Sequence, residues 1–129
     1  MATISDYIVF ADNASTLVLS SGAGPQGEKT FSATLPASIE LNSSNQRPIL
    51  MFKARTNNGS MNVEVDVNST NELGLSNFKT EAEQTVHEVV NGQLFQPSVQ
   101  NHIRFRVVGG DPQASFIVSD VVLWFQRPS

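Results

Sequence analysis

Two histidines, His87 and His102, are the only side chains in this sequence that ordinarily titrate near neutral pH. Cysteine is absent, which excludes disulfides, thiol nucleophiles and cysteine-based zinc sites. No HExxH, GxSxG, GxGxxG or GxxxxGK pattern occurs. Glu64 and Asp66 stand two positions apart and could in principle act as paired acids, but a solvated strand face is the far better explanation. We therefore predict no catalytic residue and a protein that is not an enzyme.

The sequence contains more residues that are suited to ligand binding than residues that are suited to catalysis. The single tryptophan, Trp124, falls on the polar side of an alternating run, and an indole ring stacks well on the apolar face of a sugar. Planar charged groups such as those of Arg104 and Arg106 can bind the sugar's hydroxyls. If these faces belong to one sheet, they form one ligand surface. The predicted ligand-binding residues are Trp124, Arg104, Arg106, Glu64, Asp66, Asn62 and His87.

Two other interpretations of Trp124 stay open. It could stack on an arginine and stiffen an exposed sheet, or it could be buried under a loop or in a subunit contact. The expected position of Trp124 therefore separates a sugar-binding surface from an assembly surface.

Composition narrows the class of partner. The 129 residues carry a net charge of −4 and only 16% charged residues, without the basic stripe that nucleic-acid binding requires. No apolar run approaches the length of a membrane span; the longest, Val121 to Phe125, is strand-sized. No secretory signal precedes Thr3, so we expect a cytosolic chain or a mature chain with an added start Met.

The elements that must position these residues are β-strands. Met61, Val63, Val65 and Val67 alternate with polar residues, which is the period-two pattern of a half-buried strand. Similar patterns and regularly spaced turn signals predict an all-β, two-sheet antiparallel jelly-roll sandwich of about eight strands over residues 1–129, as one domain. The predicted strands cover residues 5–11, 16–20, 29–35, 38–41, 48–56, 60–68, 85–90, 101–108 and 116–126.

Pairing and burial follow from the same patterns. Asn57-Asn58-Gly59 predicts a hairpin between the strands on either side of it, and Asp12-Asn13-Ala14 a second hairpin near the N-terminus. Residues 72–86 could hold one helical turn. The predicted core is Val63, Val65, Phe52, Phe105, Val107, Val121 and Leu123, where each large-to-small change should cost about 1–4 kcal/mol.

The last third of the chain carries a resemblance. An Asn at a strand start (Asn101) and an Asp just before a run of core aliphatics (Asp120, then Val121 to Leu123) resemble the closing strands of galactose-binding-like jelly rolls, the sandwich of many carbohydrate-binding modules. The resemblance implies a sugar-binding role and a structural calcium ion near the chain ends. Asp120 would be a calcium ligand, joined by Asp6 or by Asp12.

We therefore predict a non-catalytic, lectin-like carbohydrate-binding module, with a glycan or glycoconjugate as its partner. The alternative is a structural β-sandwich subunit of a homo-oligomer, fibre or particle. Low charge and outward aliphatics such as Met51, Val108 and Val122 favour that alternative.

Overall fold

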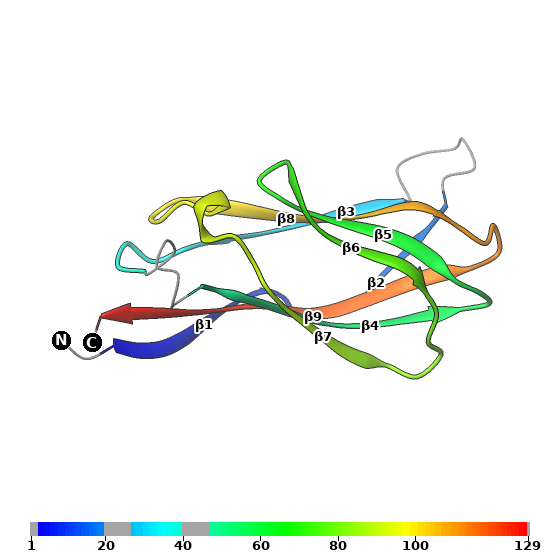
Figure 1. Cartoon of the computed structure of the whole chain (residues 1–129), viewed down its shortest axis with the longest axis horizontal. Helices are drawn as coiled ribbons and strands as arrows, with labels where there is room; N and C mark the ends of the chain where they lie inside the picture. Colours follow the sequence, from blue (N-terminus) through cyan, green and yellow to red (C-terminus); the bar gives the residue numbers. More distant parts are fainter. Residues whose placement is uncertain (1–2, 20–26, 40–46, 129) are drawn as a thin grey trace.

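The computed structural model describes residues 3–19, 27–39 and 47–128. These residues form two antiparallel sheets that pack face to face, with one short 3₁₀ helix, η1 (Gly92–Leu94) (Figure 1). The predicted all-β sandwich is confirmed. Within the described residues, no helix is long and apolar enough to cross a membrane.

The first sheet, here called sheet A, is built around the last strand of the chain. Its order is β1 (Thr3–Ala11), β9 (Ser115–Pro128), β4 (Ile49–Asn57) and β7 (Gln84–Val89), and β2 (Ser15–Val18) also pairs with β9. The second, sheet B, has the order β3 (Glu28–Thr34), β8 (Gln100–Gly110), β5 (Met61–Val67) and β6 (Thr70–Phe78). Strands that are successive in the chain therefore often lie in opposite sheets.

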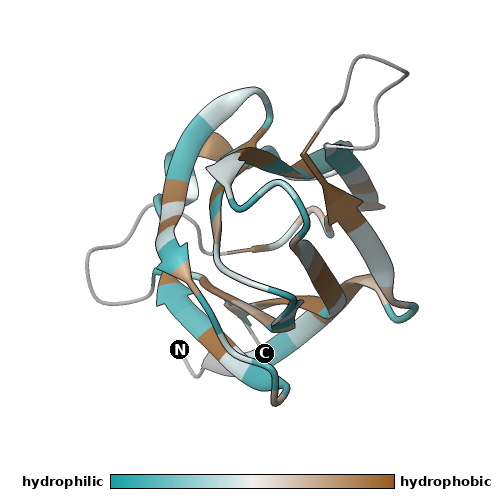
Figure 2. Ribbon diagram, turned by 90° about the vertical axis from the view of Figure 1, so that its right-hand side faces the viewer, coloured by the Kyte–Doolittle hydropathy of each residue, from teal (hydrophilic) through white to brown (hydrophobic). Residues whose placement is uncertain are grey.

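The core lies between the two sheets and is centred on aromatic rings. Phe105 of β8 contacts Phe52 of β4 edge-on, with ring centroids 4.9 Å apart, so this pair joins the sheets directly. Figure 2 views the sandwich from one end, where hydrophobic and hydrophilic segments follow one another along the strands. The whole predicted core is confirmed as buried: Val63, Val65, Phe52, Phe105, Val107, Val121 and Leu123.

The predicted hairpin at Asn57-Asn58-Gly59 is wrong. The turn exists, with Asn58 at φ 62° and Gly59 at φ 140°, but it carries the chain from β4 in sheet A to β5 in sheet B. Asp111, in the loop between β8 and β9, accepts a hydrogen bond from the Ser60 N–H at 2.9 Å. An Asn-Gly turn specifies a local reversal only, and here the reversal connects two layers.

Two further expectations are corrected. Strands β1 and β2 do not pair with each other around Asp12-Asn13-Ala14; both pair with β9, which is long enough to border both. The segment from residue 72 contains β6, not a helical turn, because Leu73 and Leu75 alternate toward the core. The predicted strand at 38–41 is not formed at residues 38–39, and its residues 40–41 lie outside the described part.

A buried asparagine, Asn101, holds the start of β8 in place through hydrogen bonds. The Oδ1 atom of Asn101 accepts hydrogen bonds from the Gln96 N–H and the Asn68 amide, each at 2.8 Å. Its amide group donates to the carbonyls of Gln96 and Val99. Asn68 itself starts the β5–β6 turn at φ 48°. Asn68 and Asn101 therefore both serve turn and loop geometry.

Candidate functional site

The outer faces of the two sheets have different chemistry, and they divide the predicted ligand-binding residues. Trp124 and His87 lie on sheet A, in β9 and β7, while Arg104 and Arg106 lie on sheet B, in β8. Asn62, Glu64 and Asp66 share sheet B with the arginines, in β5. The predicted single surface that joins Trp124 to the arginines is therefore wrong, because the last two strands belong to opposite sheets.

The outer face of sheet A carries a row of exposed apolar side chains across four strands. The register aligns Tyr7 with Trp124, Trp124 with Ile49, and Ile49 with Val89. Their exposed fractions are 53%, 37%, 39% and 54% respectively, so all four face solvent in the described structure. We call these four residues the apolar row. Contiguous exposed apolar surface of this kind commonly marks a binding site.

The two aromatic residues of the row lie side by side. The rings of Tyr7 and Trp124 have centroids 4.9 Å apart and planes inclined by 42°. A hollow of about 220 Å³ opens beside Trp124, and its polar lining comes from Ser5, Arg47 and Gln126. Aromatic rings next to guanidinium, amide and hydroxyl groups form the combination that binds sugars: apolar faces stack and polar groups take hydroxyls.

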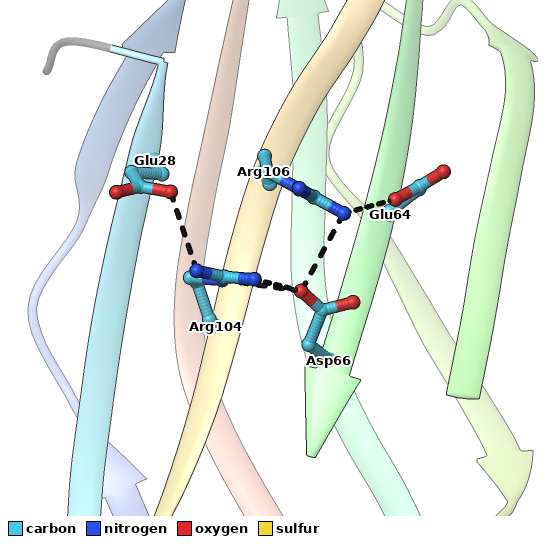
Figure 3. A network of polar contacts seen from close by, with 5 residues as sticks. All are labelled: Glu28, Glu64, Asp66, Arg104 and Arg106. Atoms are coloured by element: carbon cyan, nitrogen blue, oxygen red, sulfur yellow. Dashed lines mark hydrogen bonds and ion pairs between the residues drawn. The ribbon is translucent and has the colours of Figure 1, made fainter. Parts of the chain in front are cut away.

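The outer face of sheet B is charged and largely satisfies its own polar groups (Figure 3). Asp66 is buried, and its Oδ2 atom accepts two hydrogen bonds from Arg104, from Nε at 3.1 Å and from Nη2 at 2.5 Å. Arg106 donates to Glu64 at 2.5 Å and lies 3.7 Å from Asp66. Glu28 of β3 completes the network, 3.7 Å from Arg104.

The carboxylates of this network stabilise the charged form of Arg104. The hydrogen bonds that Arg104 donates to Asp66 are the main cause that raises the pKa of Arg104 above its usual value; burial opposes this rise. Both arginines have their charged ends committed to carboxylates of neighbouring strands, as in cross-strand ion pairs that stabilise a sheet. Among the described residues, only Asp66 Oδ1 and Arg106 Nε are buried side-chain atoms without a hydrogen-bond partner.

The other residues considered from the sequence are Asn62 and the two histidines. Asn62 accepts a hydrogen bond from the Asn77 N–H at 2.7 Å and so ties β5 to β6. His102 is exposed on sheet B, with its Nδ1 atom 2.6 Å from the Ser32 hydroxyl. His87 is exposed on sheet A, opposite Met51 in the register. Neither histidine contacts a carboxylate within the described hydrogen bonds and ion pairs.

Of the two predicted calcium pairs, that of Asp120 with Asp6 is not brought together. Asp6 aligns with Phe125, five positions along β9 from Asp120, which corresponds to about 16 Å. Each has its own cation: Arg127 donates to Asp6 at 3.0 Å, and Lys53 lies 3.7 Å from Asp120. The Tyr7 N–H, followed by Arg127, lowers the pKa of Asp6. Asp12 follows Ala11, which aligns with Val121, but the described residues contain no group of three or more metal-ligating His, Asp or Glu side chains.

We therefore expect Asp6 and Asp120 not to form a stabilising calcium site together. A ligand of the native state raises the melting temperature by mass action, whereas Asp6 and Asp120 are separated and each is paired with a cation. Thermal melting in excess EDTA and in millimolar calcium should give the same midpoint. A clear rise in calcium, lost in an Asp120→Asn variant, would contradict this expectation and restore the calcium site.

Several residues of the sheet A face were not identified from the sequence. Tyr7 belongs to a strand whose two faces, Ser5-Tyr7-Val9 and Asp6-Ile8-Phe10, are both mixed in polarity, so its outward position was not evident. Arg47 precedes a strand and showed no pattern. Ile49 and Val89 are aliphatic residues that resemble core residues by type. Only cross-strand register places these side chains around Trp124.

Comparison with known proteins gives a likeness in fold without a likeness in sequence. No protein-family model matches the chain, and no curated protein matches it. A solved structure described as carbohydrate-binding module CBM36 in complex with calcium and xylotriose matches with a TM-score of 0.55 and 10% identity, over 95% of this chain and 98% of that one. The xylan-binding module CBM15 matches with a TM-score of 0.53 and 11% identity, over 96% and 97%.

A third match comes from a much larger protein. Dimeric latent PorU from Porphyromonas gingivalis matches with a TM-score of 0.64 and 7% identity, over 98% of this chain but only 13% of that one. The chain thus has the jelly-roll fold of carbohydrate-binding modules, as the resemblance of its closing strands implied. At these identities the likeness concerns the fold, and a fold alone does not define a function.

Proposed function

We propose that this protein is a non-catalytic carbohydrate-binding module that binds its glycan on the outer face of sheet A. The observation that carries the proposal is the adjacent, solvent-facing pair of Tyr7 and Trp124 beside a hollow with Arg47 in its lining. Stacking on aromatic rings and hydrogen bonds from planar side chains are the chemistry of sugar recognition. Solved modules of the same fold are described with xylan and xylotriose, which supports a glycan as the ligand class.

Sheet A is favoured over sheet B because the arginines on the outer face of sheet B are already paired with carboxylates. On sheet B, Arg104 and Arg106 already donate to Asp66 and Glu64, so a ligand would have to break ion pairs to reach them. The described side chains on that outer face also include no aromatic ring, since Phe31 of β3 and Phe105 of β8 point into the core. Ligand binding by Arg104, Arg106, Glu64, Asp66 and Asn62 is therefore the weaker proposal.

The proposal is tested by a Trp124→Ala variant. We expect this change to weaken glycan binding by about 30-fold or more, the effect of removing an aromatic binding residue that contributes at least about 2 kcal/mol. The melting temperature should stay close to that of the parent, because Trp124 is 37% exposed and lies outside the core. A glycan array would identify the ligand, and isothermal titration calorimetry would measure the change in affinity.

Arg104→Ala provides the matched control on the opposite face. It should leave glycan affinity unchanged and should affect only stability, through its hydrogen bonds to Asp66. If Arg104→Ala abolished binding and Trp124→Ala did not, the binding face would be sheet B and the proposal would be wrong.

Self-assembly is the second candidate function, and the apolar row is the observation that favours it. Aromatic and aliphatic residues are enriched in the centres of subunit interfaces. Light scattering on the parent and on Trp124→Ala separates the two functions. A monomer that binds glycan supports the module, whereas an oligomer that dissociates in the variant supports assembly.

A further inference from the structure

We propose that the sheet A site binds the interior of an extended glycan chain, which lies across the strands, and not a single terminal sugar. This inference rests on the proposed function, since it specifies the form of the ligand at the same site. It is carried by the length, direction and charge of the exposed surface that surrounds Trp124.

The apolar row extends well beyond the hollow next to Trp124. From Tyr7 on β1 it runs through Trp124 and Ile49 to Val89 on β7, across three strand-to-strand intervals. Those intervals sum to about 14 Å, the length of about three sugar rings in an extended chain. A single sugar at the hollow would cover Trp124 and leave Val89, 54% exposed, without a contact. The row is thus matched to a ligand longer than one ring.

A second row makes the surface wide enough for a chain. Val9 aligns with Val122, and Val122 with Met51, directly beside the first row. Polar groups lie on both sides of these two rows: Arg47 in the hollow on one side, and the Lys53–Asp120 ion pair on the other. A chain that lies along the rows would place its ring faces on apolar side chains and its outer hydroxyls near hydrogen-bonding groups.

The charges on this face argue against a second copy of the protein as the occupant. The outward positions of β4 carry Lys53 and Arg55, Arg47 lies next to the row, and Asp120 is the carboxylate that lies among them. A two-fold dimer through this face would bring the same cation-rich surface together with itself. Like charges brought together in an interface oppose association. A neutral or acidic glycan chain meets no such penalty.

The test is the dependence of affinity on chain length. Xylo-, manno- and cello-oligosaccharides of one to six rings would be titrated against the protein by calorimetry. We expect affinity to increase about tenfold or more from one ring to three, and to level off beyond three, when the apolar row is covered. The far end of the row is tested by Val89→Ser, which should lower affinity for the tetrasaccharide about threefold or more and leave the disaccharide unchanged.

Val108→Ser is the matched control. Val108 is also an exposed strand valine, at 50%, but it belongs to β8 in sheet B, so its replacement should change neither affinity. If one ring bound as tightly as six, or if Val89→Ser behaved like Val108→Ser, the chain inference would be wrong while the proposed function stood. If no oligosaccharide bound, or if Trp124→Ala bound all of them normally, the proposed function itself would fail.

Discussion

Replacement of Phe105 by alanine should lower the free energy of unfolding by about 3–5 kcal/mol, the range for removal of a buried aromatic side chain. Phe105 is fully buried and makes edge contacts with Phe52 of the opposite sheet and with Phe31 of the neighbouring strand. The loss combines the transfer free energy of the ring with a cavity that two sheets cannot easily close. Urea denaturation followed by fluorescence of Trp124, with circular dichroism as a second probe, would measure it.

Phe78→Ala is the control for this prediction. Phe78 ends the edge strand β6, is half-buried, and contacts Phe116 with ring centroids 5.8 Å apart. Its replacement should cost clearly less than that of Phe105, because the site can admit water and neighbouring side chains. Equal effects of the two changes would show that Phe105 does not occupy the centre of the core.

The second large effect is expected for Asn101→Ala, at about 2–4 kcal/mol of unfolding free energy. This buried side chain makes four hydrogen bonds, to Asn68, to both backbone polar groups of Gln96, and to the Val99 carbonyl. Alanine would leave these groups without their partner, and an unsatisfied buried polar group costs about 1–3 kcal/mol. Partial access of water to the loop keeps the total below the sum for four fully buried groups.

Asn91→Ala is the matched control for Asn101→Ala. The exposed Asn91 caps η1 by accepting one hydrogen bond from the Gln93 N–H at 3.0 Å. Loss of this cap should cost only about 1 kcal/mol. If Asn101→Ala melted like Asn91→Ala, the hydrogen bonds of Asn101 would contribute little to stability. The proposed role of Asn101 at the start of β8 would then be wrong.

The two destabilising variants, Phe105→Ala and Asn101→Ala, also serve as controls for the binding experiments. Phe105 and Asn101 act on the core and on the start of β8, away from the outer face of sheet A. At temperatures well below their melting points, both variants should bind glycan like the parent. Trp124→Ala should show the reverse pattern, with intact stability and lost binding. Stability and glycan binding are therefore expected to depend on different residues.

The local pattern of the sequence determined the strands and their inward faces. Alternation of apolar and polar residues places Val63, Val65, Phe105 and Leu123 in the core because successive side chains of a strand point to opposite sides. The same alternation correctly predicted that Trp124 points outward, because its neighbours Leu123 and Phe125 are buried. The fold class followed because strands with one apolar face must pack that face on another sheet.

Only the tertiary structure decided which strands are neighbours. The Asn57-Asn58-Gly59 turn and the β8–β9 connection each cross from one sheet to the other, and a local pattern cannot distinguish such a crossing from a hairpin. The crossing separates Trp124 from Arg104 and Arg106. Pairing between distant strands brings Tyr7, Ile49 and Val89 to Trp124, and those long-range contacts form the candidate binding face.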